Sequence, residues 1–236
     1  MLTRTLGRTD IEATVVGFGG IPIQGLSSAD AGTVLLRAVE RGVNFFDTAR
    51  GYTDSEEKIG RALAPHRDRI YLASKAMSRT AEAMRGELET SLRLLRADMI
   101  DLYQCHAVGS MEVLDTVLAP GGALEALEEA REAGKIRWIG VTGHSRPVLL
   151  RAVETGRFDT VQLPFNPIET EWSEDVLPAA AAGDVGTIGM KPVAGGALRS
   201  VAASLRFILT GGIDVAIPGM DDVRQVDENC AVADGC

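Results

Sequence analysis

Apolar positions along this chain follow two alternating spacings. Residues 1–13 are predicted to form a small polar hairpin. After it, short β-branched or apolar runs are each followed by a longer segment with helical spacing. The candidate strands are Val15–Gly19, Asn44–Asp47, Ile70–Lys75, Met99–His106, Trp138–Thr142, Thr160–Leu163, Gly186–Lys191 and Val215–Pro218. The candidate helices are Ala29–Arg41, Ser55–Ala64, Ala81–Arg96, Leu124–Ala133, Arg146–Thr155 and the weaker segments 172–182, 199–209 and 222–233.

Capping residues support several of these helices. Ser27 or Ser28 precedes the first helix, and Thr80 precedes the third. Asp54, with Glu57 three residues further on, forms an Asp-x-x-Glu version of a capping box before the second helix.

The order of elements predicts the fold. Eight strands, each followed by a helix and without a linker of Pro, Gly and Ser, indicate a single-domain (β/α)8 TIM barrel over residues 1–236, capped by the hairpin. An open doubly wound sheet is the alternative, and its dinucleotide turn would carry a Gly-x-Gly-x-x-Gly that opens a helix. The segment Phe18-Gly19-Gly20-Ile21-Pro22 does not fit, because Pro22 and Gln24 come before any helix begins.

Composition narrows the class of protein. The chain is 45% hydrophobic and carries 24 basic and 33 acidic residues, so its formal charge of −9 disfavours nucleic acid and anionic membranes as partners. We see no signal peptide and no apolar run long enough to span a bilayer, and we expect a cytoplasmic protein. Three cysteines fit a reducing compartment and are too few for a four-thiolate iron–sulfur site, so we expect no metal. They are Cys105, Cys230 and Cys236.

Four chemically active side chains fall at successive strand ends. Asp47 ends the second candidate strand, Tyr52 lies in the loop after it, Lys75 ends the third strand and His106 ends the fourth. Each alone has an ordinary explanation as a cap, a packing residue, a surface lysine or a core histidine. Active sites of such barrels lie at the carboxyl ends of the strands, so four such residues there together favour a catalytic site.

At these positions the sequence resembles the aldo-keto reductase family. The resemblance covers nearly the whole chain in matching order. It rests on Gly17–Gly20, Gly42–Ala49, Tyr52 with Ser55-Glu56, Ser74-Lys75, Asp101–Gln104 before His106, Ile139–Thr142, Val161-Gln162, Met190–Pro192, Ile217–Gly219 and Glu228-Asn229.

The resemblance implies reduction of an aldehyde or ketone by hydride from a nicotinamide cofactor, with Tyr52 as general acid. A free tyrosine has a pKa of about 10, and an ammonium within roughly 4–6 Å favours the phenolate. Lys75 would therefore lower the pKa of Tyr52, and Asp47 would hold Lys75 in place. His106 would donate to the carbonyl oxygen and orient the substrate.

The resemblance also implies a cofactor site along the remaining strand ends. Thr142 and Gln162 would hold the carboxamide, Met190 would pack against the nicotinamide ring, and the loop after strand seven would approach the pyrophosphate. The full set of expected cofactor-binding residues is Gly19, Gly20, Thr142, Gly143, Gln162, Met190, Lys191, Pro192, Val193, Ala194, Gly195, Gly219, Met220, Arg224, Gln225, Glu228 and Asn229.

Several positions depart from the family pattern. The family often has Asn at the position of Gly143 and an aromatic residue at that of Met190. Residues 219–225, where members that use NADP(H) place basic side chains, contain one arginine and two aspartates, and the aspartates are expected to cap the last helix. NADP(H) is the family expectation for the cofactor, and NAD(H) is its competitor.

The chain is also short for the family. The segments after strands four and seven are brief, which predicts an open, shallow substrate site. These segments resemble a bacterial subgroup that often carries a C-terminal iron–sulfur domain. We expect that domain to be absent here, because the chain ends at Cys236 without a cysteine cluster. Cys105 is expected to point away from the site into packing.

Two other functions stay open from the sequence. One is a regulatory or sensor barrel that binds a nicotinamide nucleotide with little turnover, which the departures at Gly143 and Met190 motivate. The other is Schiff-base chemistry at Lys75, which Asp47 opposes because a carboxylate raises the pKa of a neighbouring lysine. The expected partner is a small carbonyl compound, and the protein is expected to be a monomer or a small homo-oligomer.

Overall fold

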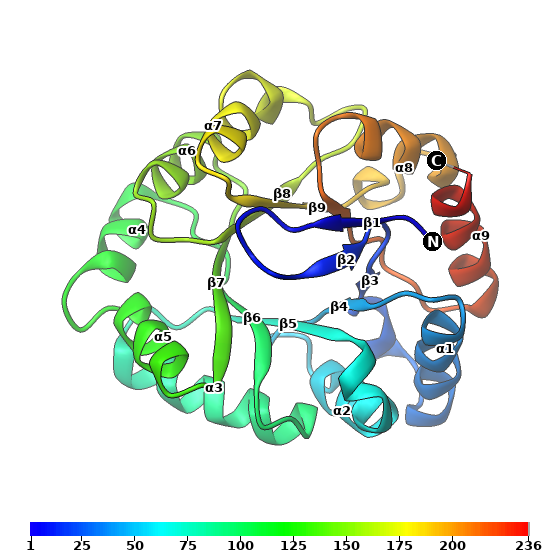
Figure 1. The fold of residues 1–236 in the computed structure, drawn as a ribbon, viewed down its shortest axis with the longest axis horizontal. Coiled ribbons are helices and arrows are strands. Elements are labelled where there is room, and N and C mark those ends of the chain that lie inside the picture. The colour runs from blue at the N-terminus through cyan, green and yellow to red at the C-terminus, as the bar shows by residue number, and fades with distance from the viewer. Residues whose placement is uncertain (236) are drawn as a thin grey trace.

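The computed structural model describes residues 1–235, so Cys236 lies outside it. Figure 1 shows a ring of strands surrounded by helices, with a hairpin across one end of the ring. The strands of the hairpin are β1 (Thr3–Thr5) and β2 (Glu12–Thr14). The strands of the ring are β3 (Phe18–Gly19), β4 (Phe45–Asp47), β5 (Tyr71–Ala76), β6 (Ile100–Cys105), β7 (Ile136–Thr142), β8 (Thr160–Pro164), β9 (Gly186–Met190) and β10 (Val215–Ala216).

The eight strands of the ring form one parallel sheet in chain order from β3 to β10. The first and last strands also meet, through the bridges Val16–Ala216 and Gly19–Gly219. The backbone N–H of Ala216 donates to the carbonyl of Val15, and that of Gly17 donates to the carbonyl of Ala216. The sheet therefore closes on itself, and the predicted (β/α)8 barrel is confirmed.

Helices cover the outside of the barrel. They are α1 (Ser28–Glu40), α2 (Ser55–Leu63), α3 (Ala81–Leu95), α4 (Met111–Leu118), α5 (Ala123–Glu132), α6 (Arg146–Glu154), α7 (Val176–Ala182), α8 (Val201–Thr210) and α9 (Val223–Asp234). Short 3-10 segments lie at Pro22–Gly25, Ala64–Arg69, Glu171–Glu174 and Ala194–Gly196. None of the helices within residues 1–235 is both long and apolar enough to cross a bilayer.

Helix α4 was not predicted from the sequence. It has only two fully buried side chains, Leu114 and Val117, so its apolar pattern is too short to stand out. Ser110 caps it by accepting a hydrogen bond from the N–H of Val113 at 3.3 Å. The segment after β6 is thus a structured helix rather than a brief loop.

The predicted helix caps have mixed outcomes. Ser27 accepts from the N–H of Asp30 and Thr80 accepts from that of Ala83, as predicted. The capping box at Asp54 is wrong, because Asp54 makes no cap hydrogen bond. Its carboxylate instead lies 2.8 Å from the ammonium of Lys58, one turn into the helix, and an ion pair there competes with capping.

The N-terminal hairpin closes the end of the barrel where the strands begin. Arg8 donates to the carbonyl of Phe158 just before β8, and the N–H of Thr14 donates to the side chain of Asn44 just before β4. The barrel interior is apolar at this level. Its buried side chains are Leu6, Ile11, Ala13, Phe45, Ala73, Leu102, Ile188, Val215 and Ile217. The interior of the barrel is therefore filled at its base, and barrels of this kind carry their sites at the opposite end.

Candidate active site

The catalytic candidates converge because their strands are neighbours. Asp47 is the last residue of β4, Lys75 lies next to the end of β5, and His106 directly follows β6. These three strands pair in parallel, so their carboxyl ends lie side by side. Tyr52 lies in the loop between β4 and α2. The backbone N–H groups of Thr48 and Arg50 in this loop donate to the carbonyls of Ala73 and Lys75 on β5, which holds the loop at this end of the barrel.

A buried ion pair forms the floor of this region. The ammonium of Lys75 lies 2.5 Å from Oδ2 of Asp47 and donates to the carbonyl of Thr48 at 2.8 Å. Both charged side chains are almost fully buried, with at most 3% exposed. Burial raises the pKa of Asp47, and the ammonium of Lys75 opposes that rise. Burying such an ion pair costs desolvation free energy, so its presence here points to a role in specificity or in chemistry.

Tyr52 and His106 lie directly beside this pair. The Lys75 ammonium is 5.0 Å from the centre of the Tyr52 ring. The ring of Tyr52 meets that of His106 edge to face, with centres 6.0 Å apart and an angle of 86° between the planes. The four side chains expected from the sequence thus form one connected group.

The pKa of Tyr52 differs from the expectation. Burial raises it above its ordinary value, and the opposing effect of the Lys75 ammonium is smaller. The sequence-based expectation of a lowered pKa considered the ammonium and not the desolvation of the phenolate. Tyr52 is therefore a protonated phenol at neutral pH and holds a proton that it can donate.

His106 is a neutral imidazole in this environment. Burial lowers its pKa to about 3, and the nearby Lys75 and Arg79 cations add to the effect. Its Nδ1 is buried and has no hydrogen-bond partner among the described residues. A neutral imidazole carries one N–H, so His106 can donate a single hydrogen bond without a positive charge.

These groups open into a cavity of about 600 Å³ at the mouth of the barrel. Asp47, Tyr52 and His106 line it, whereas Lys75, the ion-pair partner of Asp47, does not. Most of the expected cofactor residues line the same cavity: Gly19, Gly20, Thr142, Gln162, Met190, Lys191, Pro192, Val193, Gly195, Gly219, Gln225, Glu228 and Asn229. The cavity is of the size that ligand pockets commonly have, several hundred Å³.

Four expected cofactor residues do not line the cavity. They are Gly143, Ala194, Met220 and Arg224. A side chain on Gly143 would begin 2.6 Å from the carbonyl oxygen of Val108, so the backbone before α4 fills the place of the family's Asn. Met220 is fully buried in the core, and the exposed Arg224 lies 3.6 Å from Glu228, its ion-pair partner on the same helix.

One smaller expectation is met, and a second is met for one of its two residues. Cys105 is fully buried in the core, and burial raises its pKa to about 12, so it is an inert thiol. Of the two aspartates expected to cap α9, Asp222 is the N-cap residue and accepts from the N–H of Arg224 at 2.7 Å. Asp221 precedes it, and its backbone N–H donates to the side chain of Gln225 at 3.0 Å.

Two residues of this region, His144 and Gln104, were not predicted as site residues from the sequence. His144 follows β7 and lines the cavity, and the strand-end rule that found His106 would also have found it. Gln104 lies inside the barrel on β6 and is fully buried. Nothing in the sequence distinguishes its amide from an ordinary polar residue of a strand.

Comparison with known proteins identifies the family of this chain. The model of the aldo/keto reductase family matches residues 15–204. Aldo-keto reductase YhdN of Bacillus subtilis is 32% identical over 78% of this chain and 60% of its own length. L-galactose dehydrogenase of Arabidopsis thaliana is 29% identical over 83% of this chain and 66% of its own length. The chain therefore spans about two thirds or less of the length of these relatives.

A solved structure extends the likeness to three dimensions. The aldo/keto reductase from Klebsiella pneumoniae in complex with NADP and acetate superposes with a TM-score of 0.83 at 25% identity. The match covers 99% of this chain and 90% of that one. Because the family model matches most of the chain and the barrel superposes on solved members, this protein belongs to the aldo/keto reductase family.

Proposed function

We propose that this protein reduces aldehydes or ketones to alcohols, with NADPH as hydride donor and NADH as the competing cofactor. The observation that carries the proposal is the group formed by the Lys75–Asp47 ion pair, Tyr52 and His106 in one cavity. The cofactor supplies the hydride, and the protein supplies the proton and the orientation. We place the reaction in the cytoplasm, in a monomer or a small homo-oligomer.

Proton donation falls to Tyr52. Its pKa is raised by burial, so the phenol keeps its proton until an alkoxide develops beside it. The Lys75 ammonium then stabilises the phenolate that remains, because it lies 5.0 Å from the ring centre. Asp47 holds this ammonium and offsets the cost of its burial.

Substrate orientation falls to His106. Its imidazole is neutral, so it donates one hydrogen bond to the carbonyl oxygen without competing with Tyr52 as an acid. The edge-to-face contact with Tyr52 keeps the two donors next to each other. A carbonyl oxygen between them would meet both, which is the arrangement that stabilises a developing oxyanion.

The residues around the cavity fit a nicotinamide nucleotide. The Thr142 hydroxyl accepts from the N–H of Ala107 at 3.0 Å, which leaves its own proton free for a ligand. Gln162 and Met190 lie together beside it, with Nε2 of Gln162 3.8 Å from the sulfur of Met190. Glycines with positive φ at 195 and 196 allow the loop after β9 to turn close to a phosphate.

The test is the consumption of NADPH or NADH with a panel of reactive aldehydes and ketones, comparing wild type with Tyr52→Phe. We expect the variant to lose about 10²–10⁴-fold in kcat, because it lacks the proton donor, while it binds the nucleotide as wild type does. Tyr71→Phe, at the barrel base, is the control and should retain activity. Full activity in Tyr52→Phe would remove Tyr52 as the acid.

A nucleotide-binding regulatory barrel is the second candidate function. It is favoured by the backbone of Val108, which leaves no room for a side chain on Gly143 and thus removes one amide from the site. Tight nucleotide binding, measured by fluorescence, with negligible turnover of every carbonyl tested would support it. Rapid turnover of any of them would exclude it.

A further inference from the structure

Gln104 connects two parts of the site that lie on different strands. Its Nε2 donates to Oε1 of Gln162 at 2.9 Å and to Oδ1 of Asp47 at 3.4 Å. The amide is fully buried. One side chain on β6 therefore contacts both the carboxylate on β4 and the amide on β8.

This reach is possible because β7, which lies between β6 and β8, has a glycine at the same level. Gln104 pairs with Gly140 in the sheet, and Gly140 pairs with Thr160 on β8. A Cβ on Gly140 would lie 2.8 Å from Cγ of Gln104 and 2.4 Å from Oγ1 of Thr160. Such a Cβ could not be accommodated without movement, so Gly140 provides the space in which Gln104 crosses β7.

The contacts also determine which way both amides face. A carboxylate only accepts hydrogen bonds, so the group that Gln104 turns toward Asp47 must be its NH₂. The same NH₂ then donates to Gln162, which must present its carbonyl oxygen to Gln104. The NH₂ of Gln162 is left facing the sulfur of Met190, at the wall of the cavity.

We propose that Gln104 is a positioning residue: it fixes the amide of Gln162 with its NH₂ group toward the cavity, where that NH₂ group would donate to the carboxamide oxygen of a bound nicotinamide. The proposal rests on the function proposed above. Without Gln104, the amide of Gln162 is free to turn over, and its buried oxygen loses its donor. An amide that samples both orientations offers the ligand a mixture of donor and acceptor.

The experiment is nucleotide binding to four proteins: wild type, Gln104→Met, Gln162→Met and the double variant. Methionine keeps the length and approximate volume of the side chain and removes the amide. The dissociation constants of NADPH and NADH are measured by fluorescence titration without a carbonyl substrate, and the steady-state parameters are measured separately.

We expect Gln104→Met to weaken nucleotide binding about 5- to 20-fold, the usual range for losing a fixed buried hydrogen bond. Because Gln104 acts through Gln162, the double variant should bind about as well as Gln162→Met alone. In turnover, the nucleotide KM should rise by the same factor as the dissociation constant, and kcat at saturating nucleotide should fall less than about threefold.

The matched control is Tyr103→Phe, at the neighbouring position of the same strand. Its hydroxyl lies 2.9 Å from Oγ of Ser91 on the outer side of the barrel, so the variant also loses one buried hydrogen bond. It should lower the melting temperature as Gln104→Met does and leave nucleotide affinity unchanged.

Three outcomes separate the claims. If the effects of Gln104→Met and Gln162→Met multiply in the double variant, Gln104 does not act through Gln162 and the inference is wrong. If Gln104→Met binds nucleotide as wild type does while wild type turns over aldehydes, the inference alone fails. If wild type binds neither nucleotide, the proposed function fails first, and the role of Gln104 fails with it.

Discussion

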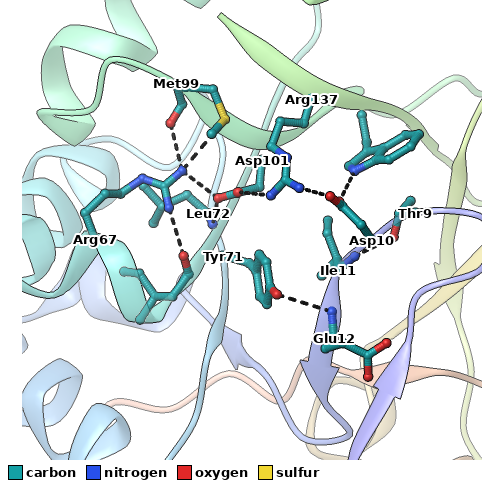
Figure 2. Close-up of polar contacts among 12 residues, drawn as sticks. Thr9, Asp10, Ile11, Glu12, Arg67, Tyr71, Leu72, Met99, Asp101 and Arg137 are labelled. Carbon is teal, nitrogen blue, oxygen red and sulfur yellow. Dashed lines mark hydrogen bonds and ion pairs between the residues drawn. The ribbon is translucent and has the colours of Figure 1, made fainter. Parts of the chain in front are cut away.

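Two buried carboxylates, Asp47 at the mouth of the barrel and Asp101 at its base, have different surroundings. Figure 2 shows Asp101 between two arginines. Arg67 donates to its Oδ2 at 2.7 Å and Arg137 donates to its Oδ1 at 3.3 Å. The N–H of Leu72 adds a third hydrogen bond at 2.8 Å. Asp47 has one lysine and the long contact from Gln104.

The base network extends to the hairpin. Arg137 also pairs with Asp10, and Asp10 accepts from Nε1 of Trp138 at 2.8 Å. Arg67 additionally donates to the carbonyls of Ile70 and Met99. The planar guanidinium has five donors in a fixed geometry and can meet several acceptors at once. These contacts therefore tie the hairpin and three strands together.

A hollow does not by itself distinguish the two ends. The base has a cavity of about 570 Å³ beside Arg67, Asp101 and Arg137, close in volume to that at the mouth. None of these three side chains has a buried polar atom without a partner among residues 1–235, whereas His106 at the mouth has one at Nδ1. At the base, the buried Nε of Arg8 also lacks a hydrogen bond, but it lies 3.3 Å from a carboxylate oxygen of Asp159 in an ion pair. A cavity lined by an unpaired polar atom, rather than empty volume alone, marks the end at which chemistry is expected.

The largest effect is expected from Lys75→Met. The change leaves Asp47 buried without a cation, which costs about 3–5 kcal/mol of stability, and it removes the charge beside Tyr52. We expect at least a 100-fold loss of kcat together with a lower midpoint of urea unfolding. Arg67→Met at the base is the matched variant and should lose stability while it keeps its activity. Equal activity losses in both variants would contradict the idea that the mouth serves catalysis and the base serves stability.

A smaller effect is expected from Asp101→Asn. The amide keeps one acceptor for Arg67 or Arg137 and loses the charge, so we expect a loss of about 1–3 kcal/mol in urea unfolding. Activity in the folded protein should stay within about twofold, since the base of such barrels serves stability. A large fall in kcat with unchanged stability would show that the base takes part in the reaction.

A further effect, of similar size, concerns stability in acid. The pKa of His106 is about 3 in the folded protein and about 6.5 when exposed, so the unfolded chain binds the proton more tightly. The neutral imidazole therefore contributes fully to the free energy of unfolding above about pH 6.5, and this contribution is lost as the pH falls toward 3. Between pH 7 and 5 this loss amounts to about 2 kcal/mol.

His106→Gln tests this dependence. We expect the variant to lose about 2 kcal/mol less than wild type over that pH interval, as measured by urea unfolding at both pH values. The comparison at pH 7 gives the baseline cost of the substitution itself. Parallel pH dependences in the two proteins would show that His106 is protonated as easily when folded as when unfolded.

Much of the fold could be predicted because its signals are local. Apolar runs such as Ile70–Lys75, together with caps such as Thr80, determine where strands and helices form, and their regular alternation leads to the barrel. Helix α4 was missed because its buried stripe is too short. The Asp54 cap failed because Lys58, four residues further along the same helix, competes for the carboxylate.

The sequence by itself determined which active residues end neighbouring strands, since parallel strands bring their carboxyl ends together. The tertiary structure alone decided the net pKa of Tyr52, because the desolvation of a phenolate depends on everything packed around it. It also decided that Val108 excludes a side chain at Gly143 and that Gly140 lets Gln104 reach Gln162. Such effects depend on the space between distant segments, which the pattern of one segment does not contain.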